Sequence, residues 1–270
     1  MDAPLLAGSA NAGTDRGVGR LVYSPARAGP RVGTRTVLGD DERTHVEDTA
    51  ASPWRMVCHL QIEGPFGSAT GTGWFAGPRT VVTAGHCVFD RDGLGGMATS
   101  IRVSPGMSDG DTAAFGSYIA TRFVTTDAWR MQQNLGSDIG AIQLDAVPGQ
   151  PDPGSVVGWF GIASLPDRQL RDTMVNISGY PARIPRQQWH ARNRITHVTP
   201  QRLFYEVDTS VGQSGGPAYV VDRPGGMPMV VGIHAHGVEN MPDGLGAPAN
   251  SAPRITTETM RLIQDWVSRN

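Results

Sequence analysis

The sequence predicts an all-β protein made of two antiparallel β-barrels with a cleft between them. Its 270 residues include 35 glycines and 20 prolines, a composition that suits short strands joined by turns. Short apolar runs bounded by turn signals recur from Met56 to Ile233. A stretch rich in Pro and Gly, residues 147–154, cannot continue a strand and divides this pattern near its middle.

The apolar runs give the expected elements in order. In the first half we expect strands at residues 56–62, 72–75, 80–83, 101–103, 119–124 and 139–144. In the second half we expect them at residues 173–180, 195–198, 203–207, 217–221 and 229–233. Residues 257–267 change to helical spacing, with Thr256 or Thr257 as N-cap, and predict a C-terminal helix. The predicted domains are 36–150 and 151–270, a barrel each, and the helix packs on the second.

Residues 1–35 stand apart from this pattern. They are rich in Gly, Ala and Arg, show no sustained apolar period and lack the apolar core of a signal peptide. A disordered tail and a propeptide are the two alternatives, and we favour the propeptide because basic, Gly- and Pro-rich flanks are readily cut by proteases.

Composition and charge narrow the function. The net charge is −2 and no block of like charges occurs, so nothing favours binding to nucleic acid or to an anionic membrane. No run of 18 apolar residues is present. Cys58 and Cys87 are the two cysteines, and the sequence leaves open whether they form a disulfide or stay as buried thiols.

One serine lies in a turn of small residues. Ser214 is the centre of Gly-Gln-Ser-Gly-Gly-Pro, residues 212–217. Small neighbours let a carbonyl group approach the hydroxyl and leave backbone N–H groups free to face it. These are the needs of acyl transfer, a nucleophile with donors for the oxyanion beside it.

Two other segments supply partners for this serine. His86 lies in Thr-Ala-Gly-His-Cys after a predicted strand, and an imidazole can take the proton of a hydroxyl. Asp138 opens the alternating segment Asp-Ile-Gly-Ala-Ile, and a carboxylate at a strand end can hold that imidazole in one tautomer. The chain order His86, Asp138, Ser214 differs from that of subtilisins and α/β-hydrolases.

These three segments resemble the His, Asp and Ser motifs of trypsin-like serine peptidases, in particular the bacterial glutamyl endopeptidase branch. Further similar segments, such as Gly-Tyr-Pro at 179–181 and Gly-Ile-His at 232–234, extend the resemblance over residues 36–270. It implies six strands in each barrel and a secreted, monomeric endopeptidase that acts on proteins or peptides. No cofactor is expected, and a calcium site is left open.

The resemblance also implies roles for single residues. Ser214 is the expected nucleophile, His86 the base and then acid, and Asp138 the group that orients His86; the N–H groups of Gly212 and Ser214 form the expected oxyanion hole. Residues 35–39 resemble a processing point with Thr36 as the new N-terminus. Gln213 stands where digestive relatives have an aspartate that pairs with the new amino group, so that ion pair is not expected.

Two features of the sequence point to different P1 residues, P1 being the substrate residue before the scissile bond. Asp208 lies where trypsins carry the carboxylate that binds Arg or Lys. His234 and Thr209 lie where glutamyl endopeptidases bind a glutamate side chain, and charge-assisted hydrogen bonds from them suit a carboxylate. We predict cleavage after Glu or Asp; the alternatives are a peptidase specific for Arg or Lys and an inactive binding module. The role of His236 is left open.

Overall fold

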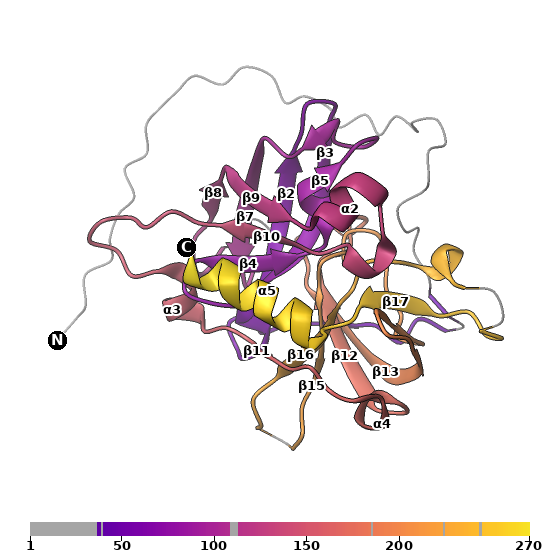
Figure 1. Cartoon of the computed structure of the whole chain (residues 1–270). Coiled ribbons are helices and arrows are strands. Elements are labelled where there is room, and N and C mark those ends of the chain that lie inside the picture. Colours follow the sequence, from indigo (N-terminus) through magenta and orange to yellow (C-terminus); the bar gives the residue numbers. More distant parts are fainter. Residues whose placement is uncertain (1–36, 39, 109–112, 185, 224, 243–244) are drawn as a thin grey trace.

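A computed structural model describes residues 37–38, 40–108, 113–184, 186–223, 225–242 and 245–270. Two sheets dominate it, antiparallel except for the parallel pair β11 and β16, with the strands of the first half of the chain in the upper part of Figure 1 and most of those of the second half in the lower part. The C-terminal helix crosses in front of both. The predictions for residues 1–35 and Thr36 lie outside the described residues.

The first sheet follows the order β8-β7-β2-β3-β4-β10-β9. Only Thr121 separates β8 from β9, yet these strands lie at opposite ends of the ladder, so the sheet curls until one segment pairs with both β7 and β10. The bounds are β2 Val57–Glu63, β3 Ser68–Phe75, β4 Thr80–Thr83, β7 Ser100–Pro105, β8 Tyr118–Ala120, β9 Arg122–Thr125 and β10 Gly140–Gln143; a small hairpin, β5 Phe89–Asp90 and β6 Gly96–Met97, lies apart.

The second sheet follows the order β11-β16-β15-β12-β13-β14-β17, with β1 added on β13. Isolated bridges join Gly232 to Arg254 and His236 to Ser251, so β16 and the segment that follows it also meet β17. The bounds are β1 Thr44–His45, β11 Gly161–Ile162, β12 Met174–Gly179, β13 Trp189–Val198, β14 Arg202–Tyr205, β15 Pro217–Val220, β16 Met229–Ile233 and β17 Asn250–Pro253.

The predicted all-β class is confirmed, but the described ladders hold seven and eight strands where six were expected in each barrel. In the first sheet, the break at Thr121 splits one expected strand into two. In the second, β1 belongs to the segment expected in the first barrel, yet it pairs with β13. Strand β17, Asn-Ser-Ala-Pro, was not predicted because it lacks an alternating apolar pattern.

The predicted C-terminal helix is α5, Thr257–Ser268. The Thr256 hydroxyl accepts a hydrogen bond from the N–H of Thr259 at 3.1 Å and so caps the N-terminus of α5. Ile263 and Trp266 bury its apolar face in a cluster that includes Trp74 of the first sheet and Val230 of the second. This cluster joins the halves, so α5, which was expected to pack on the second barrel, packs against the first sheet as well. No helix among the described residues is long and apolar enough to cross a membrane.

The remaining helices of the described residues are short. They are η1 Trp54–Met56, α1 Gly85–Val88, α2 Asp127–Gln132, η3 Leu135–Ser137, α3 Pro153–Val157, α4 Asp167–Leu170 and η4 Val238–Asn240. Two of them position candidate residues. Helix α1 follows β4 and carries His86, and η3 ends directly before Asp138.

Candidate active site

His86 and Asp138 are in direct contact. Pairing of Gly140 in β10 with Thr83 in β4 brings the segments around them together. Nδ1 of His86 lies 2.8 Å from Oδ2 of Asp138, and the backbone N–H of His86 donates to Oδ1 at 2.8 Å. The two bonds fix the carboxylate, and Asp138 has no solvent exposure. Since Nδ1 faces the carboxylate, Nε2 of His86 remains for another partner.

Charge sets the protonation of this pair. Burial alone would lower the pKa of His86, but the charge of Asp138 and its hydrogen bond outweigh burial and raise this pKa well above its usual value. Burial alone would raise the pKa of Asp138, yet the neighbouring histidines hold it below its usual range. The pair therefore favours an ionised carboxylate that stabilises an imidazolium.

The Ser214 turn packs against the chain around His86. The N–H of Thr72 donates to the Ser214 carbonyl at 2.8 Å, and the Cys87 thiol lies 3.6 Å from the same oxygen. Gly215 has a φ of +88°, and a side chain there would lie 2.2 Å from the Thr83 hydroxyl and 2.9 Å from the N of Ala84. Only glycine allows this approach. The fold thus places the serine turn beside the histidine segment.

The backbone of the serine turn leaves two donors free. Gln213 donates to the Ser210 carbonyl, and Gly215 and Gly216 donate to the carbonyls of His234 and Gln213. Within the described part of the chain, the N–H groups of Gly212 and Ser214 donate to no acceptor. Gly212 also has a φ of +96°. Two unused donors that flank one peptide unit are the arrangement an oxyanion hole requires.

Gln213 binds within its own loop. Its Oε1 accepts the N–H of Ser210 at 2.9 Å, and its side chain is fully buried. Ser210 in turn accepts a hydrogen bond from the Arg43 guanidinium at 2.7 Å. The neutral amide therefore fixes the loop that precedes Ser214, where digestive relatives have an ion pair.

His234 is buried beside a tyrosine that the sequence did not single out. The Tyr205 hydroxyl lies 2.7 Å from Nδ1 of His234, which keeps 4% of its surface exposed. Burial, His236 and His86 lower the pKa of His234 to about 3, and burial raises that of Tyr205. A neutral phenol that donates to Nδ1 leaves the proton of the imidazole on Nε2. Tyr205 lies in a predicted strand, and nothing local distinguishes it from a core residue.

Asp208 does not hold a free carboxylate. Oδ1 accepts the N–H of Leu38 at 2.6 Å, and Oδ2 accepts the N–H of Glu42 at 2.9 Å. The residue is 1% exposed, and its neighbour Thr209 is 2% exposed. The segment that begins at Leu38 therefore lies against the loop before Ser214. No local pattern indicates this contact, because its partners are far apart in the chain.

The two cysteines are free and buried, which answers the question that the sequence left open. Burial raises the pKa of the Cys58 thiol. Among the described residues, no group of three or more His, Cys, Asp or Glu side chains has the arrangement to hold a metal ion.

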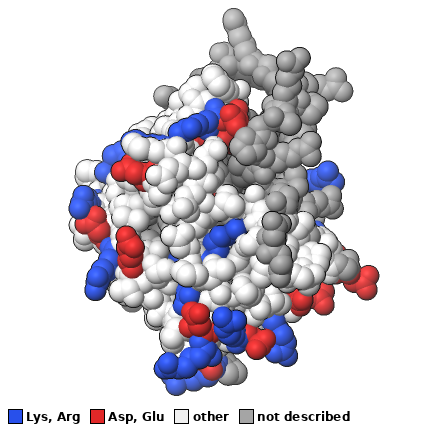
Figure 2. Space-filling view, turned by 45° about the vertical axis from the view of Figure 1, so that its right-hand side comes forward, with Lys and Arg blue, Asp and Glu red and all other residues white. Residues whose placement is uncertain are grey.

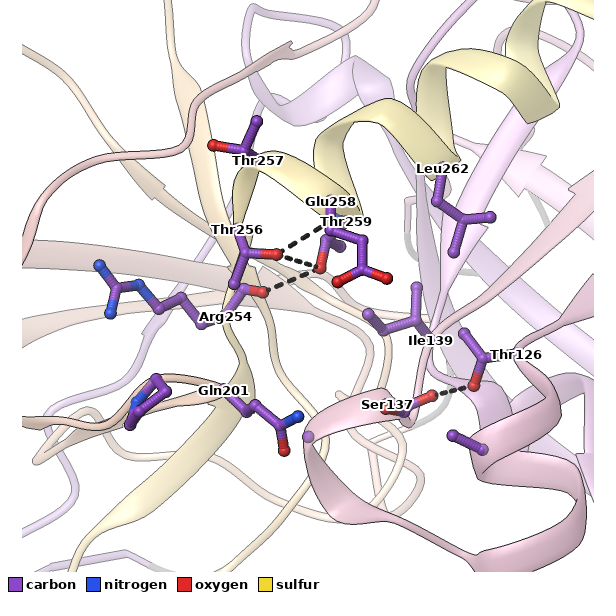
Figure 3. Close-up of a pocket in the computed structure, with 13 residues that line it drawn as sticks. Thr126, Ser137, Ile139, Gln201, Arg254, Thr256, Thr257, Glu258, Thr259 and Leu262 are labelled. Carbon is purple, nitrogen blue, oxygen red and sulfur yellow. Dashed lines mark hydrogen bonds between the residues drawn. The ribbon is translucent and has the colours of Figure 1, made fainter.

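A pocket of about 600 Å³ lies between η3 and the start of α5. Figure 3 shows Thr256, Glu258 and Thr259 at the start of α5 on one side and Thr126 and Ser137 on the other. Ser137 and Ile139, which precede and follow Asp138 in the chain, line this pocket. His86, Asp138 and Ser214 do not line it. On the face in Figure 2, positive and negative side chains are interspersed and much of the described surface is uncharged.

Comparisons with known proteins agree with this arrangement. Residues 71–233 match the trypsin-like peptidase domain. The chain is 36% identical to the glutamyl endopeptidase of Bacillus licheniformis, over 90% of this chain and 72% of that protein. It is 30% identical to a Bacillus subtilis protein named extracellular metalloprotease, over 87% of this chain and 70% of that protein. A solved Glu endopeptidase in complex with MPD superposes with a TM-score of 0.73 and 26% identity, covering 86% of this chain and all of that one.

Proposed function

This chain belongs to the trypsin-like peptidase family, and from that premise we propose that His86, Asp138 and Ser214 form its catalytic triad and that it cleaves after Glu or Asp. As a serine peptidase it acts on protein or peptide substrates. The observation that carries the proposal is the bidentate contact between His86 and the buried Asp138, with the Ser214 turn packed beside them.

The geometry supports the following reaction. Ser214 Oγ attacks the peptide carbonyl while Nε2 of His86 takes its proton, and Asp138 stabilises the imidazolium. The N–H groups of Gly212 and Ser214 bind the oxyanion. His86 then protonates the leaving amine, and water hydrolyses the acyl-enzyme by the same steps.

The preference for an acidic P1 residue rests on His234. With Tyr205 on Nδ1, the Nε2–H of His234 is a donor for a substrate carboxylate, and Thr209 is the proposed second donor. A carboxylate ligand would also stabilise the protonated imidazole, whose pKa is low in the free protein. Relatives named glutamyl endopeptidase and the solved Glu endopeptidase support the same substrate class.

The two alternatives have less support. Cleavage after Arg or Lys needs a free Asp208, and both of its oxygens accept backbone N–H groups. An inactive binding module needs neither an aligned His86 nor unused donors at residues 212 and 214.

Several broader features belong to the same proposal. We propose that residues 1–35 are a propeptide, that 36–150 and 151–270 are the two barrel domains, and that the active protein is a secreted monomer. A relative named as extracellular supports secretion.

One experiment tests the function and its substrate class together. Protein trimmed to Thr36 and untrimmed protein are assayed on matched peptides with Glu, Asp, Gln, Arg or Phe at P1. A fluorophosphonate probe reports labelling of Ser214, with Ser214→Ala as the control. We expect labelling and the highest kcat/KM for Glu. Arg as the best substrate would contradict the P1 assignment, and absent labelling of trimmed protein would contradict catalysis.

A further inference from the structure

His236 approaches the candidate catalytic carboxylate from the second half of the chain. It follows β16, and its backbone is fixed to β17: its N–H donates to the Ser251 carbonyl at 3.1 Å, and the Ser251 N–H donates back at 2.8 Å. Its side chain is 1% exposed, and Nε2 lies 3.2 Å from Oδ2 of Asp138. The same oxygen contacts Nδ1 of His86 at 2.8 Å.

Neither ring nitrogen of His236 has a hydrogen-bond partner of good geometry within the described chain. The Nε2 contact with Oδ2 of Asp138, at 3.2 Å, is within the distance range of a hydrogen bond. Because an unsatisfied buried polar group destabilises the folded protein, a buried imidazole at this position requires an explanation. A carboxylate only accepts hydrogen bonds, so the proton of a neutral His236 belongs on Nε2, facing Asp138.

Burial and the positively charged groups nearby favour the neutral form of His236, against the charge of Asp138. Asp138 faces it from the end of η3, His86 from α1, His234 from the position directly after β16 and Arg202 from β14. Burial lowers the pKa of His236, and the charges of His86 and Arg202 act in the same direction against Asp138. Arg202 is itself fixed, because it donates to the Ser251 hydroxyl at 2.6 Å.

We infer that His236 is a positioning residue whose Nε2–H holds the Asp138 carboxylate toward His86 and takes up part of its negative charge. This inference rests on the proposed triad, and it adds a second imidazole to the carboxylate of that triad. The rings of His86 and His236 lie 6.3 Å apart, on two sides of one oxygen. The backbone hydrogen bonds between Ser251 and His236 therefore link β17 to the side chain of Asp138.

The inference has a consequence for pH dependence. Without the Nε2–H of His236, the negative charge of Asp138 interacts more strongly with His86. The imidazolium is then stabilised and the pKa of His86 rises. The acid limb of kcat/KM, where His86 loses its proton, then moves to higher pH. The carboxylate is also less well held, so kcat falls while KM changes little.

The test compares His236→Leu, which has no donor, with His236→Gln, whose amide can donate. His59→Leu is the matched control, because His59 is also a buried histidine but makes no contact with Asp138 in the described structure. For His236→Leu we expect kcat to fall about tenfold and the acid limb to rise by up to about one pH unit. His236→Gln should recover most of both effects, and His59→Leu should leave the limb unchanged.

Two outcomes would overturn the inference. One is an unshifted acid limb in folded His236→Leu, and the other is a Gln variant that recovers nothing. Should the Leu variant fail to fold, ¹⁵N NMR of the wild-type histidines decides, because the inference requires the His236 proton on Nε2 and not on Nδ1. Failure of the proposed function is distinct, since wild-type Ser214 would then resist the fluorophosphonate probe.

Discussion

The backbone N–H of Leu38 donates to Oδ1 of Asp208 over 2.6 Å, joining two residues that lie 170 positions apart. Glu42 donates to the other oxygen, and Arg43 reaches Ser210 two residues further along. Leu38, Glu42 and Arg43 therefore hold the loop that leads to Gln213 and Ser214. Asp208 serves this attachment, in the position where a trypsin would bind its substrate.

Asp208→Ala should destabilise the protein without changing its P1 preference. The variant leaves the N–H groups of Leu38 and Glu42 without their acceptor, at a cost of about 1–3 kcal/mol in the free energy of unfolding. Denaturant unfolding measures this cost, and the five-peptide P1 series measures the preference. Asp145→Ala, which removes an exposed carboxylate, is the control. A large selective loss of Arg cleavage in Asp208→Ala would contradict our assignment.

Tyr205→Phe should weaken the discrimination between Glu and Gln at P1. Without the phenol, the proton of His234 is free to move to Nδ1, and the pocket loses its donor to the substrate carboxylate. We expect the ratio of kcat/KM for Glu and Gln peptides to fall about tenfold. Tyr118→Phe removes a phenol that binds the Phe115 carbonyl and should leave the ratio unchanged. An unchanged ratio in Tyr205→Phe would show that this tyrosine does not contribute to P1 specificity.

Activity should rise with pH through a pKa higher than that of an ordinary histidine, about 6.5. Protonated His86 cannot accept the Ser214 proton, and Asp138 raises the pKa of His86 despite burial. Activity is thus lost as pH falls through this raised value. The pH profile of kcat/KM on a Glu peptide measures it, and a midpoint at or below 6.5 would count against the coupling.

Asp138→Asn should lower kcat by about 10⁴-fold with a modest change in KM, the size of effect known for this substitution in a serine protease triad. The amide can donate to Nδ1 of His86 and so favours the wrong tautomer. Steady-state kinetics measures the loss, and circular dichroism checks that the variant is folded. A loss below tenfold would show that Asp138 does not orient His86.

The thiols of Cys58 and Cys87 should react with Ellman's reagent only after unfolding, because both are buried and unbridged. We expect about two thiols per denatured chain and few in the native protein, with no effect of reducing agent on Tm. Absence of thiols after denaturation would instead reveal a disulfide.

Much of the architecture could be predicted because its signals are local. Strands such as β4 and β16 are short apolar runs between turn residues, and α5 shows helical spacing after a threonine cap. Strand β17 has neither signal and forms because β14 pairs with it along its whole length. The strand at residues 119–124 was predicted whole, but it changes partner at Thr121 as the sheet curls.

Local patterns in the sequence were enough to predict the all-β class, the C-terminal helix, the resemblance to trypsin-like peptidases and the candidates His86, Asp138 and Ser214. No local pattern indicated that Asp208 binds Leu38 and Glu42, that Tyr205 contacts His234, that His236 reaches Asp138 or that the cysteines stay apart. The difference lies in the distance along the chain between the residues that interact. A motif or a periodicity lies within a few neighbouring residues, whereas these contacts join residues that are far apart in the chain and meet only when the two sheets form and pack together.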